Sequence, residues 1–416
     1  MFIFARKGVK FYQKVNINTE IKNSARPEFA RIPLAALGDD EMYLKVGPNE
    51  LISKYQLIAQ SNKKGLYVYS PFDGEFISTE LLRIPGIGKV PCGVVKTSES
   101  PQIERPFKEQ LPEYDFDSLI EMVRKSAVID EVDGVRLFKK LEDLKNREVQ
   151  AVIAYGVDDQ PFTAASTAVL LNFANEVAAG LNLVAHALGC EQKYLCIKKN
   201  YRNAKLFTDN LQGIQIVNVK GKYPSTPAVK GFCERVNGVM IGVQALRAIY
   251  QAAAYGLPQV SVVVTVWGEG IAEPGNIEVP FGTPIKTLLE QCQAFGTIER
   301  VIAGGIMTGK TAALDSPLYV SQTALTPLVK TREYKTVSCI GCGRCGSVCP
   351  VGLNPYYIMG AVKQEDFARV SQLGAASCIG CGCCSYICPS CQPVTEIMKY
   401  CRKKAYDYKK EIAYNA

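Results

Sequence analysis

Two short cysteine-rich runs near the end of the chain constrain its fold more than any other feature. They are Cys339-Ile-Gly-Cys342-Gly-Arg-Cys345-Gly-Ser-Val-Cys349-Pro350 and Cys378-Ile-Gly-Cys381-Gly-Cys-Cys384-Ser-Tyr-Ile-Cys388-Pro389. Both have the spacing C-x2-C-x2-C-x3-C-P, so the sequence contains one motif twice. Structural zinc and disulfides are the alternatives, but tandem cysteine triplets that end in Cys-Pro have little use in either. The repeat therefore predicts two metal centres.

The spacing is typical of bacterial two-cluster ferredoxins. In that arrangement three thiolates of one run bind one [4Fe–4S] cluster, and the fourth crosses to the other cluster. The first predicted ligand set is Cys339, Cys342, Cys345 and Cys388, and the second is Cys378, Cys381, Cys384 and Cys349. Cys383 adjoins Cys384 and is an alternative ligand, although the two-residue gap from Cys381 favours Cys384. Two such clusters predict transfer of electrons one at a time.

The composition is that of a globular protein long enough for about three domains, with 416 residues, of which 47% are hydrophobic and 21% charged. Its longest apolar runs have strand length and predict no membrane span. The N-terminus lacks the pattern of a signal peptide. Sixteen cysteines in a chain of this size indicate a reducing cytoplasm. The net charge of +8 is modest and is concentrated near the C-terminus. That basic stretch is a solvated helix face or a docking patch for an acidic partner, and nothing else supports nucleic-acid binding.

Hydrophobic periodicity divides the chain into four regions. Residues 1–106 read as short strands, with a hairpin around Asp73-Gly74 and a turn at Pro85-Gly86. Residues 107–256 alternate strands and helices, including helices over 163–188 and 203–212, as in a parallel sheet covered by helices. Residues 257–325 read as strand, turn, strand and helix, a small β-grasp unit. Residues 326–416 are helical and cysteine-rich. The predicted fold class is a multidomain α/β protein.

Two further features of the sequence limit its chemistry. The single histidine, His186, lies in an apolar helix, so the sequence offers few side chains for general acid–base catalysis at neutral pH. The stretch from Gly304 to Thr311 has the spacing of a phosphate-binding loop, which requires a long helix directly after it. Pro317 follows within two turns, and this argues against nucleotide binding there.

The order of the four regions resembles the RnfC family, the cytoplasmic electron-input subunits of Rnf-type complexes and their soluble relatives. The resemblance rests on both cysteine runs and on three segments: Tyr155-Gly-Val-Asp158-Asp159-Gln-Pro161, Val264-Thr-Val-Trp-Gly268-Glu-Gly-Ile-Ala-Glu-Pro274-Gly275-Asn276 and Ala303-Gly304-Gly305-Ile-Met-Thr-Gly309. It implies a barrel-sandwich-like N-terminal cap, an α/β domain like the flavoprotein subunit of complex I, an SLBB-like β-grasp unit and a domain with two [4Fe–4S] clusters.

In that family FMN and NADH lie on a glycine-rich loop, whose backbone N–H groups hold phosphate. The corresponding stretch here keeps Gly134 but carries Asp130, Glu131 and Asp133, and carboxylates repel phosphate. The family's G-x-E-C-E-P segment has neither glutamate, and its N-x-x-T turn becomes Gly242-Val-Gln-Ala245. The degenerate flavin region implied by the resemblance comprises Asp130, Asp133, Gly134, Gly156, Asp158 and Asp159.

The expected function is therefore an iron–sulfur relay without flavin. It would accept electrons from a ferredoxin or flavoprotein donor and pass them to a reductase or an Rnf-type complex, and it would reach the membrane only through that complex. The first alternative is an FMN-dependent subunit that oxidises NADH or NADPH, with FMN bound through other backbone groups. The second is an assembly subunit, whose clusters only stabilise its fold.

Overall fold

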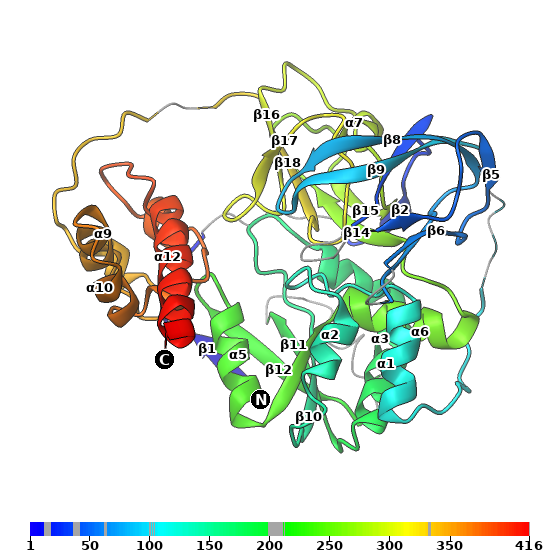
Figure 1. Cartoon of the computed structure of the whole chain (residues 1–416), viewed down its shortest axis with the longest axis horizontal. Coiled ribbons are helices and arrows are strands. Elements are labelled where there is room, and N and C mark those ends of the chain that lie inside the picture. The colour runs from blue at the N-terminus through cyan, green and yellow to red at the C-terminus, as the bar shows by residue number, and fades with distance from the viewer. Residues whose placement is uncertain are drawn as a thin grey trace.

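The structure, a computed structural model, describes residues 1–415 except 12–17, 36–41, 62–64, 100, 102, 104, 199–210, 212 and 332–333, with side chains described through Ile412. Four sheets and a helical C-terminal lobe account for the described residues (Figure 1). The mixed α/β class predicted from the sequence is confirmed. The helix predicted over residues 203–212 lies outside the described residues, apart from Leu211.

A five-stranded parallel sheet forms the α/β region. In spatial order its strands are β1 (Phe2–Ala5), β12 (Gln215–Gly221), β11 (Gln192–Lys198), β10 (Ala151–Tyr155) and β13 (Gly238–Gly242). All five residues of β10 are buried, as expected for a central strand with helices on both faces. One face is covered by α1 (Phe116–Lys125), α2 (Leu137–Glu142), α3 (Ala165–Ala187) and α6 (Val243–Tyr255). The helix α5 (Thr226–Arg235) covers the other face.

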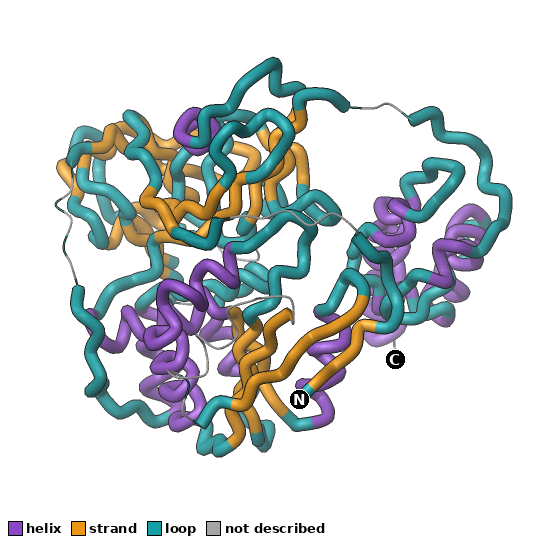
Figure 2. Tube along the Cα trace, turned by 180° about the vertical axis from the view of Figure 1, so that it is seen from behind, coloured by secondary structure: helices purple, strands orange, loops and turns teal. Residues whose placement is uncertain are grey.

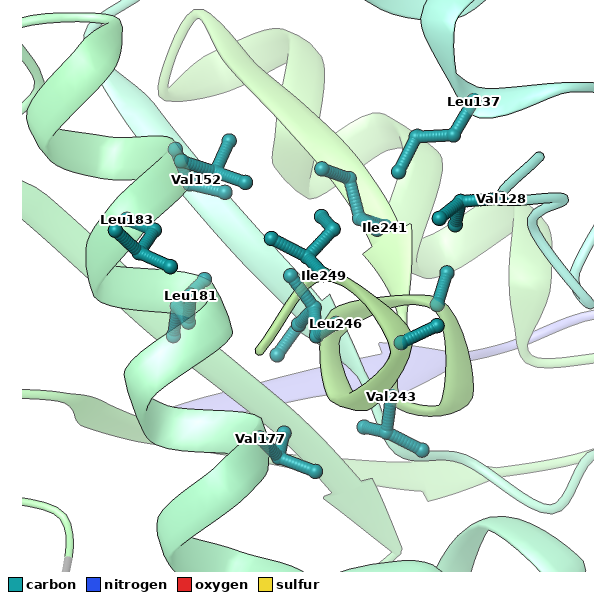
Figure 3. Close-up of a cluster of buried hydrophobic side chains, with 14 of the residues drawn as sticks. Val128, Leu137, Val152, Val177, Leu181, Leu183, Ile241, Val243, Leu246 and Ile249 are labelled. Carbon is teal, nitrogen blue, oxygen red and sulfur yellow. The ribbon is translucent and has the colours of Figure 1, made fainter. Parts of the chain in front are cut away.

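The main hydrophobic core lies between this sheet and the helices α3 and α6. Figure 3 shows how it is built: Val177, Leu181 and Leu183 of α3 point towards Val243, Leu246 and Ile249 of α6, with Val152 of β10 and Ile241 of β13 beside them. Of the described helices, only α3 is long and apolar enough to cross a membrane, with a mean hydropathy of 1.4. More than half of that window is buried within the fold, so α3 is explained as a core helix.

Close packing of α3 on α6 depends on Gly180. A β-carbon added at Gly180 would lie 2.0 Å from the backbone oxygen of Leu246, which has no room to move. We therefore expect Gly180→Ala to destabilise the fold by about 1–3 kcal/mol through overpacking, measured as a lower melting temperature. The matched control is Gly360→Ala, in a helix where nothing lies within 4 Å of the added carbon. That change should leave the melting temperature unchanged or raise it slightly. Equal effects of the two substitutions would contradict the packing argument.

The N-terminal region forms two antiparallel sheets, and two of its strands belong to other sheets. One sheet has the order β3 (Phe29–Pro33), β9 (Gly88–Thr97), β8 (Gly74–Ile84) and β5 (Glu50–Ile52), and the other contains β4 (Tyr43–Leu44), β6 (Leu57–Gln60) and β7 (Tyr67–Tyr69). The turn predicted at Pro85-Gly86 joins β8 to β9 and is confirmed. Two earlier strands leave this region, because β1 joins the parallel sheet and β2 (Ile21–Asn23) pairs with β15 (Gly275–Pro280). Two strands from residues 1–106 therefore belong to sheets that are formed mainly by later residues, across the domain boundary expected at residue 106.

The hairpin predicted around Asp73-Gly74 is wrong. The strand before it, β7, pairs with β6, whereas β8 pairs with β9 and β5. Gly74 is required for a different reason, because a β-carbon there would lie 2.2 Å from the backbone oxygen of Lys96 on β9. The Asp73 carboxylate accepts a hydrogen bond from the backbone N–H of Lys54 (2.8 Å), which fixes the crossing between the two sheets.

A six-stranded mixed sheet follows the parallel sheet. Its order is β17 (Lys310–Ala312), β16 (Arg300–Ala303), β18 (Ala324–Leu328), β14 (Ser261–Val266), β15 (Gly275–Pro280) and β2, with α7 (Ile285–Gln291) packed on its core. Gly304–Gly309 is the turn between β16 and β17, and Lys310 begins a strand rather than a helix. The phosphate-loop spacing in this stretch therefore has no helix to support it.

The C-terminal lobe is helical and is joined to the last strand by an extended segment (Figure 2). Its elements are α8 (Arg344–Ser347), α9 (Pro355–Lys363), α10 (Phe367–Gln372), η1 (Ala375–Ser377), α11 (Cys383–Tyr386) and α12 (Val394–Asn415). Their core contains Ile358, Val370 and Met398, packed beside several of the half-buried cysteines and other apolar groups.

Candidate metal centres and the adjoining cleft

The two cysteine runs have the same backbone conformation. In each run the two glycines are left-handed, with φ of +68° and +70° at Gly341 and Gly343, and +65° and +84° at Gly380 and Gly382. Each pair is followed directly by a one-turn helix, α8 in the first run and α11 in the second. Left-handed backbone at glycine lets a short loop curl so that successive thiols can face one centre. The sequence repeat is therefore also a structural repeat.

The first run contributes three of the four cysteines around one cavity of about 380 Å³. The cysteines that line it are Cys339, Cys342, Cys345 and Cys388. Tyr356, Met359 and Val394 complete an apolar wall. Cys339 and Cys342 are exposed, so this cavity lies at the surface of the lobe.

The second cavity, of about 350 Å³, mirrors the first. Its lining includes Cys378, Cys381 and Cys384 from the second run and Cys349 from the first. The backbone N–H of Leu353 donates to the Cys349 sulfur (3.3 Å), and the Thr395 hydroxyl lies 3.3 Å from the Cys384 sulfur. Each predicted ligand set thus lines one cavity.

The donor sets fit [4Fe–4S] clusters better than a single metal ion. Among the described residues, no three Cys, His, Asp or Glu side chains converge as the ligands of one ion would. A cubane cluster instead spreads its four thiolates around its corners. Four thiols around an apolar cavity, with N–H and O–H donors beside the sulfurs, are the chemistry that such a cluster requires. The ligand assignment itself stays a prediction.

The alternative ligand, Cys383, also lines the second cavity but has other partners. Its side chain is 1% exposed, and its thiol donates to the backbone oxygen of Tyr223 (3.5 Å). A hydrogen bond to Cys381, together with burial, raises the pKa of the Cys383 thiol well above its ordinary value. The hydrogen bond to Tyr223 gives the Cys383 thiol a partner outside the predicted ligand set, and this favours Cys384 as the ligand.

A large cleft adjoins the second cavity. It encloses about 1780 Å³, part of it open to solvent, and is walled by the α/β region, the six-stranded sheet and the C-terminal lobe. Ile379, Gly380 and Cys381 line both the cleft and the second cavity. A ligand in the cleft would therefore lie next to the second centre, whereas the first centre faces solvent.

Two aspartates occupy helix N-termini at this cleft. The carboxylate of Asp158 accepts from the backbone N–H groups of Ser166 (2.9 Å) and Thr167 (3.0 Å) at the start of α3. The carboxylate of Asp159 accepts from those of Ser225 (2.7 Å) and Thr226 (3.2 Å) at the start of α5. Unpaired N–H groups at a helix start are the usual binding site for a phosphate. Here the protein's own carboxylates already hold both sites.

A third helix start is occupied by Glu131. Its carboxylate accepts from the backbone N–H groups of Gln244 (2.8 Å) and Ala245 (3.0 Å) at the start of α6. It also lies so close to Gly242 that a β-carbon there would be 2.3 Å from it. The neighbouring Asp130 is fully buried and paired with Lys140 (2.6 Å). This acid pair therefore fills the place where the resemblance puts a flavin contact.

The other predicted flavin-region residues do not converge on the cleft. Gly156 is packed against Leu170, which a β-carbon would approach to 2.5 Å. Asp133 and Gly134 line a neighbouring pocket of about 700 Å³, part of it open to solvent, which shares Gly304, Thr308 and Ser321 with the cleft. Of the predicted set, only Asp158 and Asp159 line the cleft. Three helix starts that could otherwise hold a phosphate are thus bound by the protein's own carboxyl groups.

Burial of two adjacent acids makes stability depend on pH. Burial, followed by the charge of Asp130, raises the pKa of Glu131 from 4.5 to about 8. An acid whose pKa is higher in the folded state stabilises the fold at pH values below its unfolded pKa. That contribution is lost as the pH rises towards the folded pKa. We therefore expect the melting temperature to fall between about pH 4.5 and pH 8, and to fall less in Glu131→Gln. Parallel pH profiles for the two proteins would contradict this.

Sequence comparison identifies relatives of this arrangement. The 4Fe-4S dicluster domain family matches residues 332–389. The C subunit of the ion-translocating oxidoreductase complex of Rhodobacter capsulatus is 27% identical, over 85% of this chain and 74% of that protein. The corresponding protein of Methanosarcina acetivorans is 25% identical, over 98% of both chains. The chain is a homologue of these C subunits. A third relative is the C subunit of the proton-translocating ferredoxin:NAD(+) oxidoreductase complex of Clostridium ljungdahlii, 26% identical over 82% of this chain and 80% of that protein.

The resemblance to RnfC-type subunits stated from the sequence is therefore confirmed, as is the two-cluster type of the C-terminal domain. Two residues that hold the groups around the cleft in place were missed by sequence reasoning, namely Tyr223 and Lys140. Neither stands in a motif, and their partners are 158 and 10 residues away along the chain. Nothing in the local sequence could have indicated these contacts.

Proposed function

We propose that the chain is the iron–sulfur electron-transfer subunit of an Rnf-type complex and that it relays single electrons between two protein partners. The observation that carries this proposal is the pair of cavities, each lined by one predicted set of four cysteine ligands drawn from both runs. A [4Fe–4S] cluster, when bound, supplies one-electron redox chemistry. The donor would be a ferredoxin or flavoprotein, and the acceptor a reductase or another protein of the complex.

The positions of the two centres suggest how the chain relays electrons between its two protein partners. Cys339 and Cys342 are exposed, so their centre is accessible to a docked protein. Ile340 and Tyr357, which are 68% and 60% exposed, add apolar surface in the same lobe. The second centre borders the cleft instead. The cysteines therefore present one centre to a partner at the surface and the other to the interior of the molecule.

The proposal includes loss of the flavin and NADH site. Glu131, Asp158 and Asp159 each bind a helix start that could otherwise hold a phosphate. FMN and NADH both bear phosphate, and a carboxyl group already bound to the same N–H groups excludes it sterically. The alternative is an FMN-dependent subunit that oxidises NADH or NADPH. It is favoured by the size of the cleft and by the NAD(+) in the name of the Clostridium relative.

The finer fold assignments belong to the same proposal. We assign residues 1–106 to a barrel-sandwich-like cap, 107–256 to a domain like the complex I flavoprotein subunit, 257–325 to an SLBB-like β-grasp unit and 326–416 to a two-cluster ferredoxin-type domain. The pairing of β14 antiparallel to β15 and parallel to β18 supports the β-grasp assignment. The protein would act in the cytoplasm and would lie at the membrane only through its complex.

Metal and flavin analysis of the protein purified without oxygen tests the proposal. About eight irons per chain and no flavin are expected. Stoichiometric flavin would favour the NADH-oxidising alternative, and fewer than about four irons would overturn the proposal. The assembly alternative is tested separately with Cys342→Ala in the intact complex. Unchanged electron transfer in that variant would favour a purely structural role for the clusters.

A further inference from the structure

Tyr223 joins the C-terminal lobe to the α/β region at the second centre. It lies between β12 and α5 and is 5% exposed. Its hydroxyl donates to the backbone oxygen of Cys381 (2.8 Å), and its own backbone oxygen accepts from the Cys383 thiol (3.5 Å). Its backbone also pairs with Val9 in both directions at 2.9 Å. A single residue thus holds the second cysteine run from two sides.

Gln160 supports this tyrosine from the loop after β10. Its amide nitrogen donates to the Tyr223 hydroxyl oxygen (3.2 Å) and to the Thr308 hydroxyl (2.8 Å). Its amide oxygen accepts from the backbone N–H of Met307 (3.2 Å). The backbone oxygen of Met307 in turn packs so closely on Gly382 that a β-carbon there would lie 2.5 Å away. The side chain of Gln160 therefore ties the six-stranded sheet and the α/β region to the second run.

The hydrogen-bond arrangement fixes the direction of the Tyr223 hydroxyl. A phenol oxygen carries one hydrogen, and an amide nitrogen can only donate. Because Gln160 donates to the tyrosine oxygen, the hydroxyl hydrogen is free to point at the Cys381 carbonyl. Its positive end then lies beside the second cavity and compensates the negative carbonyl oxygen. Cys381 lines that cavity, and an added electron there would be stabilised because the hydrogen bond offsets part of the negative charge on the Cys381 carbonyl.

We propose that Tyr223 and Gln160 are positioning residues for the second centre: they hold its cysteine run against the cleft and raise its reduction potential relative to the first centre. This rests on the proposed function, since Cys381 must be a cluster ligand.

The test is a redox titration followed by electron paramagnetic resonance, on the full chain with both clusters assembled. Tyr223→Phe removes only the hydroxyl. The second centre should become harder to reduce, with a roughly fivefold lower ratio of reduced to oxidised cluster at a fixed potential, the effect of one ordinary hydrogen bond. The first centre should not change. The matched control is Tyr155→Phe, which removes a hydroxyl that bonds Thr226 in the same cleft without contacting a cysteine run.

A second variant tests the role of Gln160 without changing its size. In Gln160→Met, an uncharged side chain of similar length, no amide donates to the Tyr223 oxygen, so the hydroxyl is no longer held towards Cys381. The second centre should again become harder to reduce. The proposal is overturned if neither variant moves it, if both centres move equally, or if Tyr155→Phe has the same effect. Iron content separates these results from a failure of the proposed function, because absent clusters refute that function before any titration.

Discussion

Replacing Cys388 with alanine is expected to abolish the first cluster and to leave the second intact, although Cys388 belongs to the second run. The reason is that Cys388 crosses from the second run to the first cavity, which it lines together with Cys339, Cys342 and Cys345. Iron should fall from about eight to about four atoms per chain. The spectrum of the remaining cluster should match that of Cys345→Ala, and Cys349→Ala should give the complementary spectrum. Iron analysis and electron paramagnetic resonance measure both results.

Cys391→Ala is the matched control for this series. Cys391 is another half-buried cysteine that follows the second run closely, and it lines neither cavity. It should retain about eight irons and both signals. If Cys388→Ala instead resembled Cys384→Ala, each run would bind its own cluster and the predicted ligand sets would be wrong.

Removing the Glu131 carboxylate is expected to convert an internally satisfied helix start into an anion site. Glu131→Ala frees the N–H groups of Gln244 and Ala245, which should cost about 1 kcal/mol of stability, as for the loss of a helix cap. Inorganic phosphate should then raise the melting temperature of the variant, because an anion can bind the freed N–H groups.

The same phosphate concentrations should leave the melting temperature of the wild-type protein unchanged. Glu131→Gln serves as the control, since its side chain still fills the site and accepts a hydrogen bond. An equal effect of phosphate on all three proteins would indicate binding elsewhere. It would remove the main structural support for a lost flavin site.

Local patterns in the sequence predicted much of this fold. The spacing of the cysteines indicated the two centres, because the ligands of each run are neighbours along the chain. Helix periodicity placed α3 within a few residues of its observed bounds, because a buried face repeats every three to four residues.

Long-range pairing could not be predicted in this way. The apolar run at residues 2–5 is compatible with a strand but does not show that it joins β12, more than 200 residues away. The strands β16, β17 and β18 are three to five residues long and lie among glycines and prolines, so their periodicity is too short to detect. At the site, three acids were recognised as incompatible with phosphate. Of these, only Glu131 binds a helix start, and Asp158 and Asp159 bind the other two. Which acids do so depends on where α3, α5 and α6 begin in space, which local patterns do not encode.

On the proposed function, the clusters are reached by single electrons from protein partners and not by hydride from NADH. The most direct measurement follows the visible absorbance of the purified, oxygen-free protein as each reductant is added. Reduced ferredoxin should bleach the cluster absorbance, whereas NADH should leave it unchanged even after FMN is supplied. Bleaching by NADH in the presence of one bound FMN per chain would contradict the account.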